Sequence, residues 1–295
     1  MHIIRTAICV ILVLACSGAY AQDYEIRMER PEKAGAKYEL TAHGSTSERM
    51  VLNVQQQVVK EDGLTISGEL AGIITILETD ELMREKKIKL TITRCVMSKN
   101  GKAYENDVLK KGTEIIARLD NHKETFLVND KPVPEEVDKF LGLFISANRS
   151  RLSDDDVFGT KERKKVGDSW PVNSTLAARD LTGDGMPVAT ENVKGSTKLE
   201  KLVDVDGIKC LHLTGNLQIN HMNPPMPPGF ILETSNLTGL FSGDYPVDAS
   251  MAPLSKSMTM TAVFSGKGKP GPDSPEFTLT VEKIQSSEEK CKYLK

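Results

Sequence analysis

Hydrophobic and polar residues alternate along most of the chain, which is the pattern of a β-strand with one apolar and one polar face. In the clearest case, at 37–43, Tyr38, Leu40 and Ala42 alternate with polar neighbours. The same period of two recurs in the segments 50–58, 88–96, 211–219, 258–264 and 277–281. Strands of this kind form antiparallel sheets with one face in water. The pattern predicts an all-β, mainly antiparallel fold of curved, half-barrel-like sheets.

One segment, 134–147, has the period of a helix instead. Its apolar residues fall on a single helical stripe, at Val137, Phe140, Leu141, Phe144 and Ile145. Pro134 suits the first helical position, and the acidic residues after it suit the positive end of the helix dipole. We predict one amphipathic helix over 134–147 that packs on the concave apolar face of a sheet. A helix docked elsewhere on the surface is the alternative.

A short pattern occurs twice, about one domain length apart. Residues 33–38 and 165–170 both read Lys-x-Gly-x-x-aromatic, and both precede alternating segments. The glycine suits a turn, and the aromatic residue suits the entry to a strand. The repeat predicts two related β modules in tandem, 23–160 with the helix and 161–295. Trp170 is predicted to anchor the second module in its core.

Residues 165–170, Lys-Val-Gly-Asp-Ser-Trp, follow the predicted helix at mid-chain. This arrangement resembles an uncharacterised family of exported bacterial proteins with a Lys-x-Gly-Asp-x-Trp signature midway along a β-rich chain. The segments 243–246 and 258–260 are also similar to that family. The resemblance implies an exported β-rich fold and no assigned activity. In architecture alone, curved sheets around a helix resemble the half-barrels of lipoprotein carriers.

The first 21 residues indicate where the protein works. Arg5 gives a basic start, 6–15 is an apolar core, and Ala19-Tyr20-Ala21 is a small-x-small cleavage site. We predict a signal peptide over 1–21 and a mature protein in the periplasm or outside the cell. The alternative is cleavage before Cys16 and lipid anchoring through its thiol. No later apolar stretch is long enough for a transmembrane helix, so no membrane span is predicted.

Charge and cysteine content narrow the range of partners and of covalent chemistry. The formal net charge is −3 with both signs interspersed, so no nucleic-acid partner is predicted. After the leader, Cys95, Cys210 and Cys291 remain, an odd number for an exported protein. Either one disulfide leaves one thiol over, or all three cysteines are reduced.

The sharpest metal motif is a near match to a calcium loop. Asp180, Thr182, Asp184 and Glu191 stand at its oxygen-ligand positions 1, 3, 5 and 12, and Gly185 stands at position 6. Threonine at position 3 removes a charge, Pro187 disturbs the backbone pairing, and no exiting helix follows. A polar surface loop is the favoured interpretation, and no metal or cofactor is predicted.

Catalytic patterns are missing from the sequence. None of the histidines His43, His122, His212 and His221 has the spacing of a zinc-hydrolase motif. His43 and His212 fall on the polar faces of predicted strands. The chain has neither a nucleophile elbow nor a glycine-rich phosphate loop. We therefore predict a non-catalytic protein with no catalytic, cofactor-binding or metal-binding residues.

The sequence is compatible with three functions, which differ in what occupies the space on the concave face of the sheet. The leading hypothesis is an envelope or periplasmic protein that binds a lipid or other apolar molecule there. The alternative is a structural or protein-interaction module with a closed core, whose partner is another envelope protein. An uncharacterised enzyme is the third.

Overall fold

The computed structural model describes residues 22–294, except for 106–107, 121–122, 148–151, 184, 227, 270 and 272–273. The predicted signal peptide over 1–21, with Cys16 and the cleavage site after Ala21, lies outside the described residues. So do His122 and Asp184, the third candidate ligand of the calcium loop.

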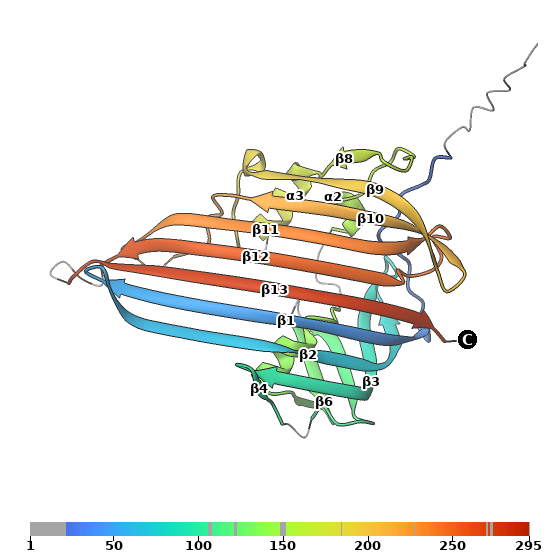
Figure 1. The fold of residues 1–295 in the computed structure, drawn as a ribbon, viewed down its shortest axis with the longest axis horizontal. Helices are drawn as coiled ribbons and strands as arrows, with labels where there is room; N and C mark the ends of the chain where they lie inside the picture. The colour runs from blue at the N-terminus through green and yellow to red at the C-terminus, as the bar shows by residue number, and fades with distance from the viewer. Residues whose placement is uncertain are drawn as a thin grey trace, which may run out of the picture.

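All the strands belong to one antiparallel sheet (Figure 1). Across the sheet the strands follow the order β7 (Lys131–Pro132), β6 (Lys123–Val128), β5 (Glu114–Asp120), β3 (Glu85–Lys99), β2 (Gln57–Thr79), β1 (Lys37–Val54), β13 (Phe277–Tyr293), β12 (Ser255–Gly268), β11 (Phe230–Pro246), β10 (Ile208–Ile219), β9 (Val193–Val205) and β8 (Ser169–Pro171). The short strand β4 (Lys102–Ala103) pairs with β3 outside this path. The open, curved antiparallel sheet confirms the predicted all-β fold class.

The first and last strands of the described chain meet in the middle of the sheet, where Tyr38–Val54 of β1 pairs with Phe277–Tyr293 of β13. Strands from the N-terminal half lie on one side of this pair, and strands from the C-terminal half lie on the other. The predicted modules 23–160 and 161–295 therefore share one continuous sheet. Their relationship to each other stays a prediction.

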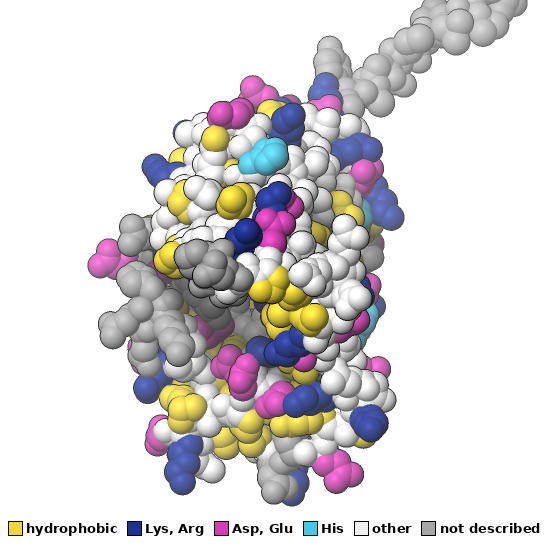
Figure 2. Space-filling model, turned by 90° about the vertical axis from the view of Figure 1, so that its left-hand side faces the viewer, with side chains coloured by type: hydrophobic (Ala, Val, Ile, Leu, Met, Phe, Trp, Pro, Cys, Tyr) yellow, Lys and Arg dark blue, Asp and Glu magenta, His cyan; other side chains and the backbone are white. Residues whose placement is uncertain are grey.

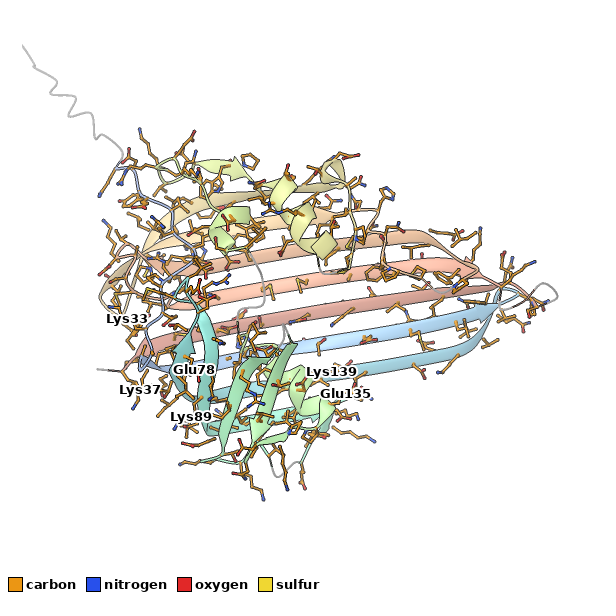
Figure 3. All side chains as sticks on the ribbon, turned by 180° about the vertical axis from the view of Figure 1, so that it is seen from behind. Lys33, Lys37, Glu78, Lys89, Glu135 and Lys139 are labelled. Carbon is orange, nitrogen blue, oxygen red and sulfur yellow. The ribbon has the colours of Figure 1, made fainter. Side chains whose placement is uncertain are left out.

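One face of the sheet, here called the inner face, carries the cores and the helices. Residues directly opposite in antiparallel strands share a face, so the register places Leu40, Gly72 and Cys291 together on the inner face. The helices α1 (Glu135–Leu141), α2 (Asp154–Val157) and α3 (Ser174–Gly183) all contribute buried side chains to cores on this side. Seen from behind, α1 with Glu135 and Lys139 lies toward one edge of the inner face, and α3 lies toward the opposite edge (Figure 3).

The hydrophobic core is divided rather than continuous. In the N-terminal half, α1 buries Val137, Phe140 and Leu141 against β1–β6, which confirms that this helix packs on the concave face of the sheet. In the C-terminal half, one cluster forms around Trp170 and Leu213, and another around α3. None of the three clusters includes the inner-face residues Lys256, Met258, Ser287 and Glu289, at the start of β12 and toward the end of β13.

The predicted helix over 134–147 is too long. The helix ends at Leu141. Gly142 is its C-cap residue, and the backbone N–H of Gly142 donates to the carbonyl oxygen of Asp138. Phe144 and Ile145 are still buried, so the helical spacing of apolar residues continues through a compact turn. The structure also adds α3 and the shorter α2 in the C-terminal half. The apolar contribution of α3 comes mainly from alanines, which gave no clear stripe.

The predicted strand over 50–58 crosses a hairpin turn. Gln55 and Gln56 both have positive φ, 51° and 66°, and they connect β1 to β2. Two consecutive left-handed residues are the signature of a type I′ turn, which usually carries asparagine or glycine. Because glutamine is uncommon there, the alternation of Val54 and Val58 concealed the turn.

The two Lys-x-Gly-x-x-aromatic segments form the same local structure. Gly35 and Gly167 have φ of 89° and 96°, which favours glycine at both sites. Each glycine N–H donates to a strand carbonyl, of Ile76 in one half and Leu199 in the other, at 2.8 and 2.7 Å. The amides of Ile76 and Leu199 each bond back to the carbonyl of the residue after the glycine. Both turns therefore dock on the neighbouring strand in the same way.

An extended segment at 22–34, here called the N-terminal strap, crosses between the two halves before β1 begins (Figure 1). Every second side chain is buried, at Tyr24, Ile26, Met28, Arg30 and Glu32. The first three join the core around Trp170, and Tyr24 also bridges to Lys164. The strap thereby carries two charged residues into the interior.

Candidate ligand-binding cavity

A cavity of about 690 Å³ lies where the two cores do not meet. Its floor is the inner face of the sheet near the start of β12 and the end of β13, with Lys256, Ser287 and Glu289. These inner positions are polar, whereas the equivalent positions on the flanking strands are mostly apolar. Since polar side chains do not extend a hydrophobic core, the sheet is left uncovered at this place.

The walls come from parts of the chain that are distant in sequence. Residues 28–32 of the N-terminal strap form one wall, the turn at 142–146 after α1 forms another, and Ala252 and Pro253 form a third. These lining residues lie toward the end of the sheet where β1 begins and β13 ends. Figure 2 shows the opposite end, where β1 meets β2, with hydrophobic, acidic and basic side chains around a hollow between the two halves.

Polar contacts of Met28 and Arg30 hold the strap in place. The Asp155 carboxylate accepts the backbone N–H of Met28 at 2.7 Å. The Arg30 guanidinium donates to the carbonyl oxygens of Pro246 and Asp248, at 2.9 and 3.2 Å, and lies over the Tyr245 ring. These contacts fix the backbone that presents Glu32 to the cavity.

Three charged side chains face the cavity without a close partner. Glu32, Lys256 and Glu289 make no side-chain hydrogen bond or salt bridge with any residue in the described part of the chain. Lys256 and Glu289 stand directly opposite each other on β12 and β13. Glu32 is only 6% exposed, although its carboxyl group borders the cavity. Lys256 is exposed and Glu289 is half-buried, so Glu32 is the one of the three that lacks the partner a buried ionisable group normally has.

The pKa values follow from this environment. Burial raises the pKa of Glu32 to about 7, the Glu85 carboxylate adds to the effect, and Lys256 opposes it. Burial likewise raises the pKa of Glu289 to about 7 against the attraction of Lys256. Burial disfavours the charge of Lys256, but Tyr245, Asp154, Glu289 and Glu85 together raise its pKa above the ordinary value. Lys256 is therefore charged at neutral pH, whereas Glu32 and Glu289 titrate near neutrality.

Part of the remaining lining is apolar. Leu40, Ile74 and Ile88 contribute from β1, β2 and β3, Phe144 from the turn after α1, and Met258 from β12. An apolar wall next to a small number of convergent polar groups is typical of sites for small organic ligands. The arrangement can hold an apolar body and orient a polar or charged end.

All three cysteines have free thiols, so the reduced alternative holds among the described residues. Burial raises the pKa of Cys95 and of Cys210 to about 11, and that of Cys291 to about 12. Cys291 lines the cavity as a neutral thiol. Because the thiolate is the nucleophile, none of the three thiols is activated at neutral pH.

The candidate calcium residues do not form the predicted loop. Asp180 and Thr182 lie in α3, and the Thr182 hydroxyl donates to the carbonyl oxygen of Ala178 at 2.8 Å. Glu191 lies in a 3₁₀ helix, Thr190–Asn192, beyond the end of α3. Helical backbone at the first ligand positions replaces the sharp bend that the motif requires. Among the residues that the structure describes, no cluster of three or more potential metal ligands occurs.

Trp170, His43 and His212 do not line the cavity. Trp170 is buried in the C-terminal core, as predicted, and its indole N–H donates to the carbonyl oxygen of Phe158 at 2.7 Å. His43 and His212 lie on the outer face, where His43 is 3.2 Å from Glu288. His212 lies 2.7 Å from the Asp244 carboxylate, which also accepts the Ser255 hydroxyl. The serine does not reach the histidine, so this cluster lacks the order of a catalytic triad.

A second hollow, of about 770 Å³, lies beside β3 and is bordered by Arg94, Tyr104 and Lys111. Its border includes Glu105, which is followed in the sequence by 106–107, outside the described residues. We therefore assign the candidate site to the cavity between the cores.

Sequence reasoning missed the cavity residues, although two signals were present. On β13 the apolar alternation of Phe277, Leu279 and Val281 stops, and the inner positions that follow are polar as far as Glu289. In the N-terminal strap, Tyr24, Ile26 and Met28 alternate with polar residues. The alternation of buried positions continues through Arg30 and Glu32. Because these two residues are charged, the sequence did not indicate that they are buried.

Comparisons with known proteins leave the family open. No protein-family model matches the chain, and no curated protein matches it. The outer membrane protein OprG from Pseudomonas aeruginosa aligns over 90% of this chain and 99% of its own, with 8% identity and a TM-score of 0.18. DynF from the dynemicin biosynthesis pathway of Micromonospora chersina aligns over 94% and 88%, with 9% identity and a TM-score of 0.16.

The LolA superfamily protein NE2245 from Nitrosomonas europaea aligns over 90% of both chains, with 8% identity and a TM-score of 0.16. Likenesses at these scores carry no argument about function. Within the described ranges, no helix has the length and hydrophobicity needed to cross a membrane.

Proposed function

We propose that this protein is an exported, non-catalytic protein of the bacterial envelope that binds an apolar or amphipathic small molecule in the cavity between its two cores. The location follows from the predicted signal peptide over 1–21 or, in the lipid-anchored alternative, from Cys16. One observation carries the proposal: no core cluster covers the inner face at Lys256, Ser287 and Glu289, and a cavity of about 690 Å³ lies there. Ligand sites of this kind typically measure about 300–1,000 Å³.

The cavity also separates the leading hypothesis from its main alternative. A structural or protein-interaction module would have a sheet closed on its own side chains. Here the cores around Phe140 and Trp170 stop on either side of the polar floor. The unfilled volume next to the turn at 142–146 is the feature that the binding hypothesis requires.

Filling the floor of the cavity is expected to weaken binding. Ser287 is 5% exposed and faces the cavity, so Ser287→Leu places an isobutyl group in the ligand volume. With the uncharged dye N-phenyl-1-naphthylamine, we expect fluorescence titration to give affinity lower by about tenfold, the loss that ~1.4 kcal/mol produces.

Ser286→Leu is the matched control, because Ser286 lies next in the strand, on the outer face, with its hydroxyl 3.0 Å from that of Ser45. Circular dichroism checks that both variants fold. Equal dye affinity in wild type, Ser287→Leu and Ser286→Leu would place the dye elsewhere and contradict the proposed site.

A further inference from the structure

We propose that the cavity selects a cationic amphiphile, an alkyl chain that carries an amine or quaternary ammonium group. This inference rests on the proposed function and specifies its ligand class. Its basis is the charge balance of the lining, together with one buried acidic side chain that has no close partner.

Acidic groups outnumber basic groups around the cavity. The charged residues of the lining are Glu29, Glu32, Glu85, Glu124, Asp154 and Glu289 on the acidic side, and Arg30 and Lys256 on the basic side. The two terminal nitrogens of the Arg30 guanidinium donate to backbone carbonyls, and its Nε is buried without a hydrogen-bond partner among the described residues. Lys256 is the other basic side chain of the lining, and it stands opposite Glu289.

The Glu32 side chain is an independent indication of a ligand. It is more than nine-tenths buried, it borders the cavity, and it has no hydrogen bond or salt bridge within the described part of the chain. Leaving a buried polar group unpaired is costly, and a charged group more so. A ligand ammonium group placed at Glu32 would supply the missing positive charge and, for an amine, the missing donor.

The opposite charge fits poorly. An anionic head group would add a negative charge beside Glu32 and Glu289, with Lys256 alone to offset all of them. The apolar residues Leu40, Ile74 and Phe144 border the same cavity. A ligand with a cationic end at the carboxyl groups and an alkyl chain along this wall satisfies both parts of the lining.

The test compares three ligands that share one alkyl chain. Decyltrimethylammonium, decanoate and decanol are titrated calorimetrically into the mature protein at pH 8, each below its micelle-forming concentration. We expect the ammonium ligand to bind about tenfold tighter than decanoate, as for one charge-assisted interaction. Glu32→Gln and Glu289→Gln should each weaken ammonium binding by about fivefold and leave decanol binding within about twofold.

Glu288→Gln provides the control for net charge. Glu288 neighbours Glu289 in β13 but lies on the outer face beside His43, so this variant should bind all three ligands as the wild type does. Equal or tighter binding of decanoate, or equal losses for ammonium and decanol in the glutamine variants, would overturn the inference and leave the proposed function standing. If none of the three decyl ligands binds, the proposed function fails as well.

Discussion

Replacing Trp170 with alanine is expected to lower the free energy of unfolding by about 3–5 kcal/mol, the usual cost of removing a large aromatic side chain from a core. The indole ring is 5% exposed and packs with Tyr24, Met28 and Leu213. Its N–H also satisfies the carbonyl oxygen of Phe158. The substitution therefore leaves a cavity and an unpaired buried acceptor together.

Urea unfolding followed by far-ultraviolet circular dichroism measures this loss, because Trp170 is the single tryptophan and the alanine variant has no indole fluorescence. Trp170→Phe keeps most of the ring packing and removes the donor, so it should lose only about 1–3 kcal/mol. A loss below about 1 kcal/mol for Trp170→Ala would contradict the role of this residue as a core anchor.

Trp170 also connects stability to the proposed site. Tyr24, Ile26 and Met28 of the N-terminal strap pack in the same core, and the strap continues into the cavity wall at Arg30 and Glu32. Loosening this core should make the strap more susceptible to proteolysis under native conditions. It should also weaken ligand binding in variants that are still folded.

The second large effect is a fall in stability between pH 5 and pH 8 caused by Glu32 and Glu289. Both carboxyl groups have a pKa of about 7 in the folded protein, against an ordinary value of 4.5. The folded state therefore binds more protons than the unfolded chain in this window, and the free energy of unfolding falls as the pH rises. Allowing for water in the open cavity, the two groups together should account for roughly 3 kcal/mol.

The double variant Glu32→Gln/Glu289→Gln isolates this contribution from other titrating groups. Glutamine imitates the protonated carboxyl group, so the variant should equal the wild type at pH 5 and exceed its unfolding free energy by roughly 3 kcal/mol at pH 8. Glu288→Gln, which alters an exposed pair with His43, should change stability by less than about 1 kcal/mol at either pH. Parallel pH curves for wild type and double variant would contradict the buried, unpaired state of these carboxyl groups.

The alternation of apolar residues was sufficient to predict the fold class, because a one-sided sheet imposes a period of two on every strand that it buries. The same signal failed at Gln55 and Gln56, where a turn interrupts the strand without the usual turn residues. It also failed at α3, because Ala177 and Ala178 bury too little surface to mark a helical face. The Asp-x-Thr-x-Asp spacing at 180–184 suggested a loop, but its first residues continue α3.

The cavity was harder to predict, since it depends on contacts between distant parts of the chain. Glu32 comes from the N-terminal strap, and Lys256 and Glu289 come from strands near the C-terminus. Only the pairing of β1 with β13 brings these segments together. In the sequence, a polar residue at an inner position of one strand is only an irregularity in the alternation. The pairing of neighbouring strands places several such residues together, and they form the floor of the cavity.

The matching hydrogen bonds of the turns at Gly35 and Gly167 support the proposal that 23–160 and 161–295 are related modules. On that proposal, the cavity lies at the junction of two similar units. The Lys-x-Gly-Asp-x-Trp resemblance places its signature in the second turn, where Trp170 enters β8.

Native mass spectrometry of the mature protein, purified from an export-competent bacterial host, shows whether the cavity holds a ligand. We expect a non-covalent adduct that disappears on denaturation and is reduced in Ser287→Leu but not in Ser286→Leu. The same spectrum distinguishes a chain that begins at Gln22 from one that carries a lipid on Cys16. A bare chain that takes up none of the three decyl ligands would contradict a binding role for the cavity.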